Sequence, residues 1–311
     1  MRNGLMRNRL TPNSVITNNP GFPAIRQLGA DDLRSCAALS VDRGWWPERG
    51  KWALLLDASD GFGIDAPDGQ GLAGSVVVTR WGTERAAIGM MLIASRYGGQ
   101  GLGRALMEHA LSVAGEGAAV SLYATDSGRP LYDKLGFQPV RRSVAFRGRF
   151  HADPQTHSGK KDGAPAETPG DIRVVTEADL PAILTLDRAV YGADRERILG
   201  RMSAFAERFV VLEAGDGIVG YAAAWRTEAF LFIGPLVAPD GAAARRLVTE
   251  LAADSPVAVR LDLDPDRPEL PGWARDHGLM ATERTVCMTH GDLTPRGIPE
   301  RVFTPISVAM A

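Results

Sequence analysis

The sequence is poor in cysteine, with two among its 311 residues. Cys36 and Cys287 cannot form a framework of disulfides, so we expect a reducing compartment and a cytoplasmic location. No run of 18 apolar residues occurs, and we therefore expect no membrane-spanning helix. The net charge of −2 gives no electrostatic basis for binding nucleic acid or an anionic membrane. No spacing of histidine and cysteine indicates a metal site.

Two stretches are expected to lie outside the folded parts. Residues 1–22 carry three arginines and no acid, and we interpret them as a flexible leader. Residues 151–171 are rich in proline, glycine, lysine and threonine, which is typical of a linker. The linker predicts two domains, 23–150 and 172–311, each of ordinary domain size.

The two parts repeat one pattern of segments. Each begins with a short strand and a helix whose apolar residues stand three and four positions apart. Four pairs of segments match in the same order and at nearly constant spacing, which indicates two copies of one unit. The pairs are IRQLGADDLRSCAAL with IRVVTEADLPAILTL, GLAGSVVVTRW with GIVGYAAAWRT, AIGMMLIA with FIGPLVAP, and KLGFQPVRRSVAF with DHGLMATERTVCM. Each copy is predicted to run strand, helix, helix, three strands, helix, strand, helix, strand, an α/β (α+β) fold.

Four glycines stand within six residues of the first copy, in ASRYGGQGLGRALMEHAL (94–111). The uncharged segment before them suits a buried strand, and the segment after them has the periodicity of an amphipathic helix. A strand, a glycine loop and a helix N-terminus form a phosphate site, because backbone N–H groups meet the anion where the helix dipole is positive. A P-loop needs Gly-Lys-Ser/Thr, and a dinucleotide fingerprint needs a third glycine where Arg104 stands, so both are excluded.

This stretch resembles the pyrophosphate-binding segment of the GNAT superfamily of N-acetyltransferases. Gly101 and Gly103 match the glycines of its Arg/Gln-x-x-Gly-x-Gly/Ala motif, and Gly98 replaces the leading Arg/Gln. The resemblance implies two tandem domains, each with a mixed, mostly antiparallel sheet flanked by helices, and acetyl-CoA as cosubstrate without a metal. It also implies a backbone N–H from the preceding strand to the thioester oxygen. The implied acetyl-CoA-binding residues are Met91, Leu92, Ile93, Gly98, Gly99, Gln100, Gly101, Leu102, Gly103 and Arg104.

A second motif supports the resemblance. GRPLYDKLGF (128–137) is similar to the family segment in which a short helix with Leu-Tyr precedes Leu-Gly-Phe and a final strand. In that family the tyrosine lies beside the CoA sulfur as general acid, a role that falls on Tyr132. The Asn or Ala often found earlier in the segment is replaced by Thr125 and Gly128. DRGWWPERGKWALLL (42–56) resembles a tandem-GNAT subgroup in which a Gly-Trp segment leads into the second helix.

The second copy lacks both motifs. In place of the glycine loop it has PLVAPDGAAARRLVTEL, with Gly241 as the one glycine, and Ala274 occupies the position of Tyr132. We therefore expect a degenerate GNAT-like domain that keeps the fold and walls the acceptor site.

The sequence indicates the general base and the acceptor pocket less strongly than it indicates the two motifs above. Glu84 opens the predicted fourth strand and Asp126 follows the fifth, so either carboxylate can face the cleft, although both are also ordinary strand-end charges. Trp45 and Trp46 lie between the first two helices, a segment that borders the acceptor pocket in this family. Since neighbouring side chains point in different directions, we expect one of these tryptophans in the core and the other in the pocket.

The predicted activity is acetyl transfer from acetyl-CoA to the primary amine of a small molecule, by direct attack in a ternary complex. Two alternatives stay open: a protein N-acetyltransferase, and an acyl-CoA sensor without turnover. The sequence is compatible with a monomer or a homodimer. At the C-terminus, Ile306, Val308 and Met310 alternate as in a half-buried strand, and we expect this strand to join the two copies.

Overall fold

The computed structural model describes residues 21–152, 169–215, 217–292 and 296–310. Most of the predicted leader and linker lies outside these residues. Among the helices in the described ranges, none combines the length and apolar character that crossing a membrane requires.

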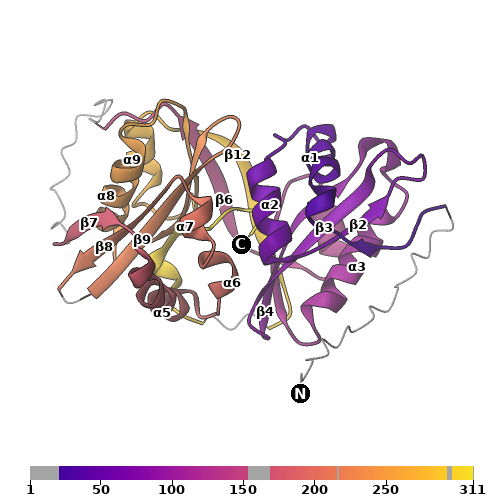
Figure 1. Cartoon of the computed structure of the whole chain (residues 1–311), viewed down its shortest axis with the longest axis horizontal. Coiled ribbons are helices and arrows are strands. Elements are labelled where there is room, and N and C mark those ends of the chain that lie inside the picture. The colour runs from indigo at the N-terminus through magenta and orange to yellow at the C-terminus, as the bar shows by residue number, and fades with distance from the viewer. Residues whose placement is uncertain (1–20, 153–168, 216, 293–295, 311) are drawn as a thin grey trace, which may run out of the picture.

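The predicted order of elements is confirmed in the first copy, and the second copy follows it with an additional short helix and an additional last strand (Figure 1). The first copy contains β1 (Arg26–Gln27), α1 (Leu33–Asp42), α2 (Arg49–Ala58), β2 (Asp60–Asp65), β3 (Leu72–Trp81), β4 (Arg85–Ile93), α3 (Leu102–Ala114), β5 (Ala119–Ala124), α4 (Arg129–Lys134) and β6 (Gln138–Gly148). The second contains β7 (Asp171–Val174), α5 (Leu180–Tyr191), α6 (Glu196–Leu199), α7 (Met202–Phe205), β8 (Arg208–Ala214), β9 (Gly217–Arg226), β10 (Leu231–Val237), α8 (Gly241–Ala252), β11 (Val259–Leu263), α9 (Pro271–Asp276), β12 (Met280–His290) and β13 (Val302–Thr304).

The last strands of the two copies are exchanged. β12 of the second copy pairs antiparallel with β5 of the first, while β6 of the first pairs with β11 of the second. β6 and β12 also pair with each other, and Figure 1 shows both between the two halves of the molecule. One sheet of 13 strands results, so the division at the linker does not separate two independent sheets. An exchanged strand forms the same ladder hydrogen bonds as a strand of its own copy, and the segment pattern therefore does not reveal the exchange.

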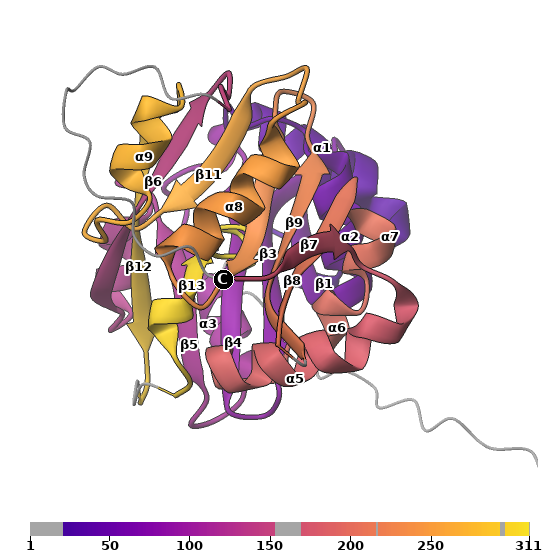
Figure 2. The same ribbon diagram turned by 90° about the vertical axis from the view of Figure 1, so that its left-hand side faces the viewer.

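Apolar cores lie on both faces of this sheet. α3 covers one core in the first copy, and α8 covers another in the second. A third, central core joins α1 and α2 to α5, α6 and α7, and it contains Trp52, Ile198 and Trp225. Figure 2 shows α1, α2, α6 and α7 gathered on one side, with α8 and α9 on the other. Because each large apolar side chain buried there contributes about 1.5–3 kcal/mol, this core joins the copies into one folding unit.

The C-terminal segment connects the two copies, but not as predicted. The strand is β13, which pairs with β10, whereas residues 305–310 form no strand. Ile306 and Met310 are both fully buried in the central core. The alternating pattern was misleading because this segment is surrounded by the two copies, so nearly every position is buried.

Candidate active site

The site is built around an opening between two parallel strands. The ladder between β4 and β5 ends at the pair Ile88 and Leu122, after which the strands separate. Beyond this point β4 contains a bulge, where Met90 adopts a left-handed conformation with φ of 49°. The buried hydroxyl of Ser75 donates a hydrogen bond to the Met90 carbonyl at 2.9 Å and holds the bulge. Ser75 and the bulge were not predicted, because no local pattern marks the backbone angle of a single methionine.

The glycine loop follows β4 and leads into α3. Gly99 and Gly101 have φ of 75° and 80°, a region that side chains rarely adopt, and a Cβ at either position would meet open space. No side chain caps α3, whose N-cap is Gly101. Its first N–H groups therefore have no acceptor within the helix. An uncapped helix start beneath an open glycine loop fits a pyrophosphate, which these N–H groups and the helix dipole would stabilise.

Gly103 packs the loop onto the rest of the site. A Cβ there would approach side-chain carbons of Met91 and Leu131 to 3.3 Å. The helix N-terminus thus lies directly against the end of β4 and against α4. The structure brings the predicted segments 91–93 and 98–104 together, as the resemblance implies.

The turn before the loop is fixed to the connection between α1 and α2. The Ser95 N–H donates to the Asp42 carboxylate at 2.6 Å, and Arg43 donates to the Ser95 hydroxyl at 2.9 Å. Trp45 and Trp46 follow in this connection, with 40% and 50% of their surface exposed. Both tryptophans are therefore on the surface beside the loop, and the prediction that one belongs to the core is wrong. They remain candidates for a wall of the acceptor pocket.

Tyr132 lies on α4 and is 8% exposed. Its ring packs at 5.9 Å from that of Phe137, and burial raises the pKa of its phenol to about 12. A Cβ on Gly128 would come 3.1 Å from a ring carbon of Tyr132 and 3.5 Å from its hydroxyl. Glycine at 128 thus leaves room for the tyrosine, which accounts for this departure from the family motif. The phenol stays protonated at neutral pH, as a general acid must.

The two candidate bases lie at opposite ends of the site strands. Glu84 precedes β4, while the glycine loop follows it, so the strand separates them by about 25–30 Å. Glu84 also forms an ion pair with Arg296. Glu84 is therefore the weaker candidate for the base, and its catalytic role stays a prediction. Asp126 lies in the exposed turn after β5, at the same end as the loop, and remains a candidate.

In the second copy the corresponding anion site is closed. Asp240 is the N-cap of α8, and its carboxylate accepts a hydrogen bond from the Ala243 N–H at 2.8 Å. The side chain of Glu269 packs against Gly241, where a Cβ would meet it at 2.6 Å. The Asp240 carboxylate thus occupies this helix start, with the stem of Glu269 packed beside it, and the negative charge would repel a pyrophosphate.

The strand opening of the second copy is also filled. β10 and β11 pair in parallel at Leu231 and Phe232 and then separate, as β4 and β5 do. β13 pairs with β10 beyond that point, with Leu236 opposite Thr304. Ala274, at the position of Tyr132, is fully buried. The expected degeneracy therefore has three structural causes: a capped helix, an occupied strand opening and a missing phenol.

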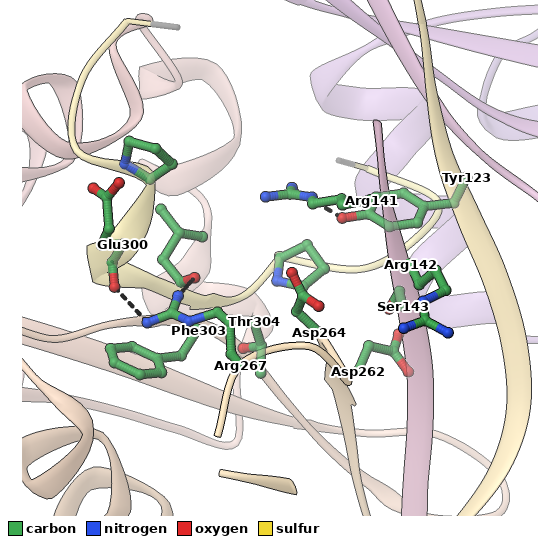
Figure 3. Close-up of a pocket in the computed structure, with 13 residues that line it drawn as sticks. Tyr123, Arg141, Arg142, Ser143, Asp262, Asp264, Arg267, Glu300, Phe303 and Thr304 are labelled. Carbon is green, nitrogen blue, oxygen red and sulfur yellow. Dashed lines mark hydrogen bonds between the residues drawn. The ribbon is translucent and has the colours of Figure 1, made fainter. Parts of the chain in front are cut away.

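A cavity of about 320 Å³ lies between the two copies (Figure 3). Its walls include Tyr123 and residues 141–143 of the first copy, and Asp262, Asp264, residues 299–300 and residues 302–305 of the second. Tyr123 directly follows Leu122, the last β5 residue paired with β4, so this wall adjoins the strand opening. Sequence reasoning missed the cavity, because its walls come from strands that the exchange brings together. Within the described parts of the chain, no cluster of metal-ligating side chains is found.

Two family models match the chain. The acetyltransferase (GNAT) family matches residues 28–137, and an acetyltransferase (GNAT) domain matches residues 183–304. The chain is also similar to the uncharacterized N-acetyltransferase YitH of Bacillus subtilis (strain 168). The two are 28% identical over 228 residues, which cover 72% of this chain and 77% of YitH.

Solved structures share the fold. A protein of Pyrococcus horikoshii assigned as an acetyltransferase has a TM-score of 0.76 at 16% identity, over 96% of this chain and 99% of that one. A tandem GNAT protein from the clavulanic acid biosynthesis pathway has a TM-score of 0.57 at 14% identity, over 87% of this chain and 99% of that one. The tandem arrangement of this chain thus has a solved counterpart.

Proposed function

Because the chain belongs to the GNAT acetyltransferases, with a domain of that family in each half, we propose that it transfers an acetyl group from acetyl-CoA to the primary amine of a small molecule. The observation that carries the proposal is the contrast between the two helix starts. α3 begins uncapped beneath an open glycine loop, whereas α8 is capped by Asp240. One acetyl-CoA per chain, in the first copy, follows from this contrast.

The first copy contains the residues that would hold acetyl-CoA. The N–H groups at 99–104 would bind the pyrophosphate, and the free edge of β4 at 91–93 would receive the remainder of the molecule. Acetyl-CoA supplies an activated acetyl thioester. A β4 N–H would donate to the thioester oxygen and stabilise the charge that develops there.

The reaction forms a C–N bond and breaks the C–S bond. Tyr132 gives its phenolic proton to the leaving sulfur, a contribution of roughly 10²–10⁴-fold for a positioned acid. Asp126 is the nearby base, and it takes the proton of the amine through solvent. The phenol then regains its proton from solvent. The raised pKa of Tyr132 supports this role, because the group holds its proton until the thiolate leaves.

Two observations favour a small acceptor over a protein acceptor. The interdomain cavity has the volume of a small-molecule site, and both copies enclose it. The buried phenol of Tyr132 favours turnover over a sensor, since binding alone does not require an acid. We further propose a cytoplasmic location, which agrees with the two buried, unpaired cysteines.

Release of free thiol from acetyl-CoA, measured with a panel of amines, tests the function. The expected result is thiol release that depends on one class of small amine and is matched by acetylated product. Thiol release with a protein acceptor and none with any small amine would favour the protein N-acetyltransferase. CoA binding without release in either case would favour the sensor.

A further inference from the structure

The cavity between the copies contains ionic groups of both signs. Arg141, Arg142 and Arg267 line it together with Asp262, Asp264 and Glu300. Two of the arginines already have partners. Arg142 forms an ion pair with Asp266, and Arg267 donates to the carbonyls of Val302 and Glu300 at 2.9 and 2.6 Å.

Arg141 has no carboxylate partner within the described residues. It donates a hydrogen bond to the phenol oxygen of Tyr123 at 3.1 Å (Figure 3), and it also interacts with the thiol of Cys287. The groups that act on its charge are Tyr123, Cys287 and Tyr191, which are two phenols and a thiol. Its positive charge is therefore left for an anion that the protein itself does not provide.

Tyr123 adds a second donor at the same place. Because its oxygen accepts from Arg141, its own proton can go to another acceptor, and the protein group beside it is the thiol of Cys287, a weak acceptor that an anion can replace. Burial raises the pKa of this phenol above its ordinary value, so the proton is kept at neutral pH. An anion between the two side chains would receive a charge-assisted hydrogen bond and a phenolic one, which is a strong combination.

Asp262 provides a negatively charged group on another wall of the cavity. It is 2% exposed, and its Oδ1 accepts from the Arg260 Nε at 2.9 Å. Its Oδ2 is buried and has no partner among the described residues. This oxygen is enclosed by protein atoms, so Asp262 contributes negative charge to the wall and not an acceptor open to the cavity. The cavity thus presents a donor pair at one end and a negatively charged wall elsewhere.

We propose that this cavity binds the acceptor, and that the acceptor is a small primary amine which also carries a carboxylate or phosphate group. The anion binds Arg141 and Tyr123, next to the opening between β4 and β5. The proposal rests on the proposed acetyltransferase function, whose acceptor class it names.

Calorimetry on the full chain saturated with CoA tests the proposal with pairs of amines that differ in one anionic group. The pairs are L-leucine with L-leucinamide, L-lysine with L-lysinamide, O-phosphoethanolamine with ethanolamine, and D-glucosamine 6-phosphate with D-glucosamine. We expect the anionic member of at least one pair to bind at least tenfold more tightly than its neutral partner. The carboxylate and phosphate pairs distinguish the two sources of anion.

Two variants then test where the anion binds. In the amine pair that shows tighter binding of its anionic member, Arg141→Gln should reduce that difference in affinity to less than threefold. The CoA dissociation constant should not change. Arg142→Gln, which removes a neighbouring arginine that has its own carboxylate, should keep the preference. An equal loss in both variants would indicate a general charge effect and overturn the proposal.

Two further outcomes overturn the proposal: equal binding of both members of every pair, and no binding of any anionic member. The acetyltransferase function fails separately, if CoA does not bind or no amine releases thiol from acetyl-CoA. Acetyl transfer that is equally efficient for amines with and without an anionic group would support the acetyltransferase function. It would refute only the proposal about the acceptor.

Discussion

The carbonyl of Ala309 lies so close over Gly89 that a side chain at position 89 has no room. Gly89 is the first β4 residue beyond the ladder with β5, and Ala309 belongs to the C-terminal segment of the second copy. The same relationship recurs at Gly234 of β10, which lies against the carbonyl of Pro305. The segment 305–309 therefore crosses the equivalent bulges of both copies.

Gly89→Ala should destabilise the protein, because the new methyl group meets a main-chain carbonyl and not a flexible side chain. We expect a loss of about 1–3 kcal/mol, as for other overpacked sites, and a melting temperature several degrees lower. The control is Gly272→Ala in α9, where a Cβ would meet nothing within 4 Å. An unchanged melting temperature for Gly89→Ala would show that the C-terminal segment does not pack there.

Calorimetry should give one CoA site per chain. Gly101→Ala should weaken CoA binding by at least tenfold, since alanine resists a φ of 80° and the loop would have to change its backbone conformation. Asp240→Ala removes the cap of α8 and should cost about 1 kcal/mol of stability while leaving CoA affinity unchanged. Two equivalent sites per chain would refute the closure of the second copy.

Tyr132→Phe should lower kcat and kcat/KM together by roughly 10²–10⁴-fold, because the proton for the leaving sulfur is lost. The CoA dissociation constant should not change, since the ring and its packing against Phe137 remain. The measurement is steady-state kinetics with the amine found in the thiol-release assay. An unchanged kcat, with chemistry shown to limit the rate, would make Tyr132 a packing residue.

The pH profile of kcat/KM should show no decrease from ionisation of Tyr132 below about pH 10. Burial raises its pKa to about 12, so the acid stays protonated in this range. We expect kcat/KM to rise with pH as the acceptor amine deprotonates, and then to level off. An alkaline limb near pH 8–9 that disappears in Tyr132→Phe would contradict the raised pKa.

The strand exchange predicts how the chain behaves when it is divided. Residues 1–152 and 169–311, expressed together as separate chains, should purify as one complex, because β12 completes the first copy and β6 the second. The first piece alone should aggregate, since the free edge of β5 exposes a buried strand. A folded, monomeric first piece that binds CoA would mean that β6 can replace β12 beside β5.

Much of this architecture followed from local sequence patterns. Helix and strand periods, the internal repeat and the glycine loop predicted the order of elements and the resemblance to the GNAT family. Gly101 and Tyr132 were identifiable as candidates because neighbouring residues encode the helix start and the short helix on which they lie. The base stayed open between Glu84 and Asp126, because a strand-end position in the sequence does not say which end of the sheet it occupies relative to the loop.

The sequence by itself determined two α/β units, one with a glycine loop and the tyrosine of the family motif and one without either. Only the tertiary structure decided that β6 and β12 change places, and that residues 302–310 fill the second opening and cover Gly89. It alone brought Arg141 and Asp262 to one cavity. The physical reason is that local propensities specify each strand, whereas the choice of strand neighbours depends on long-range packing among edges with equivalent hydrogen bonds.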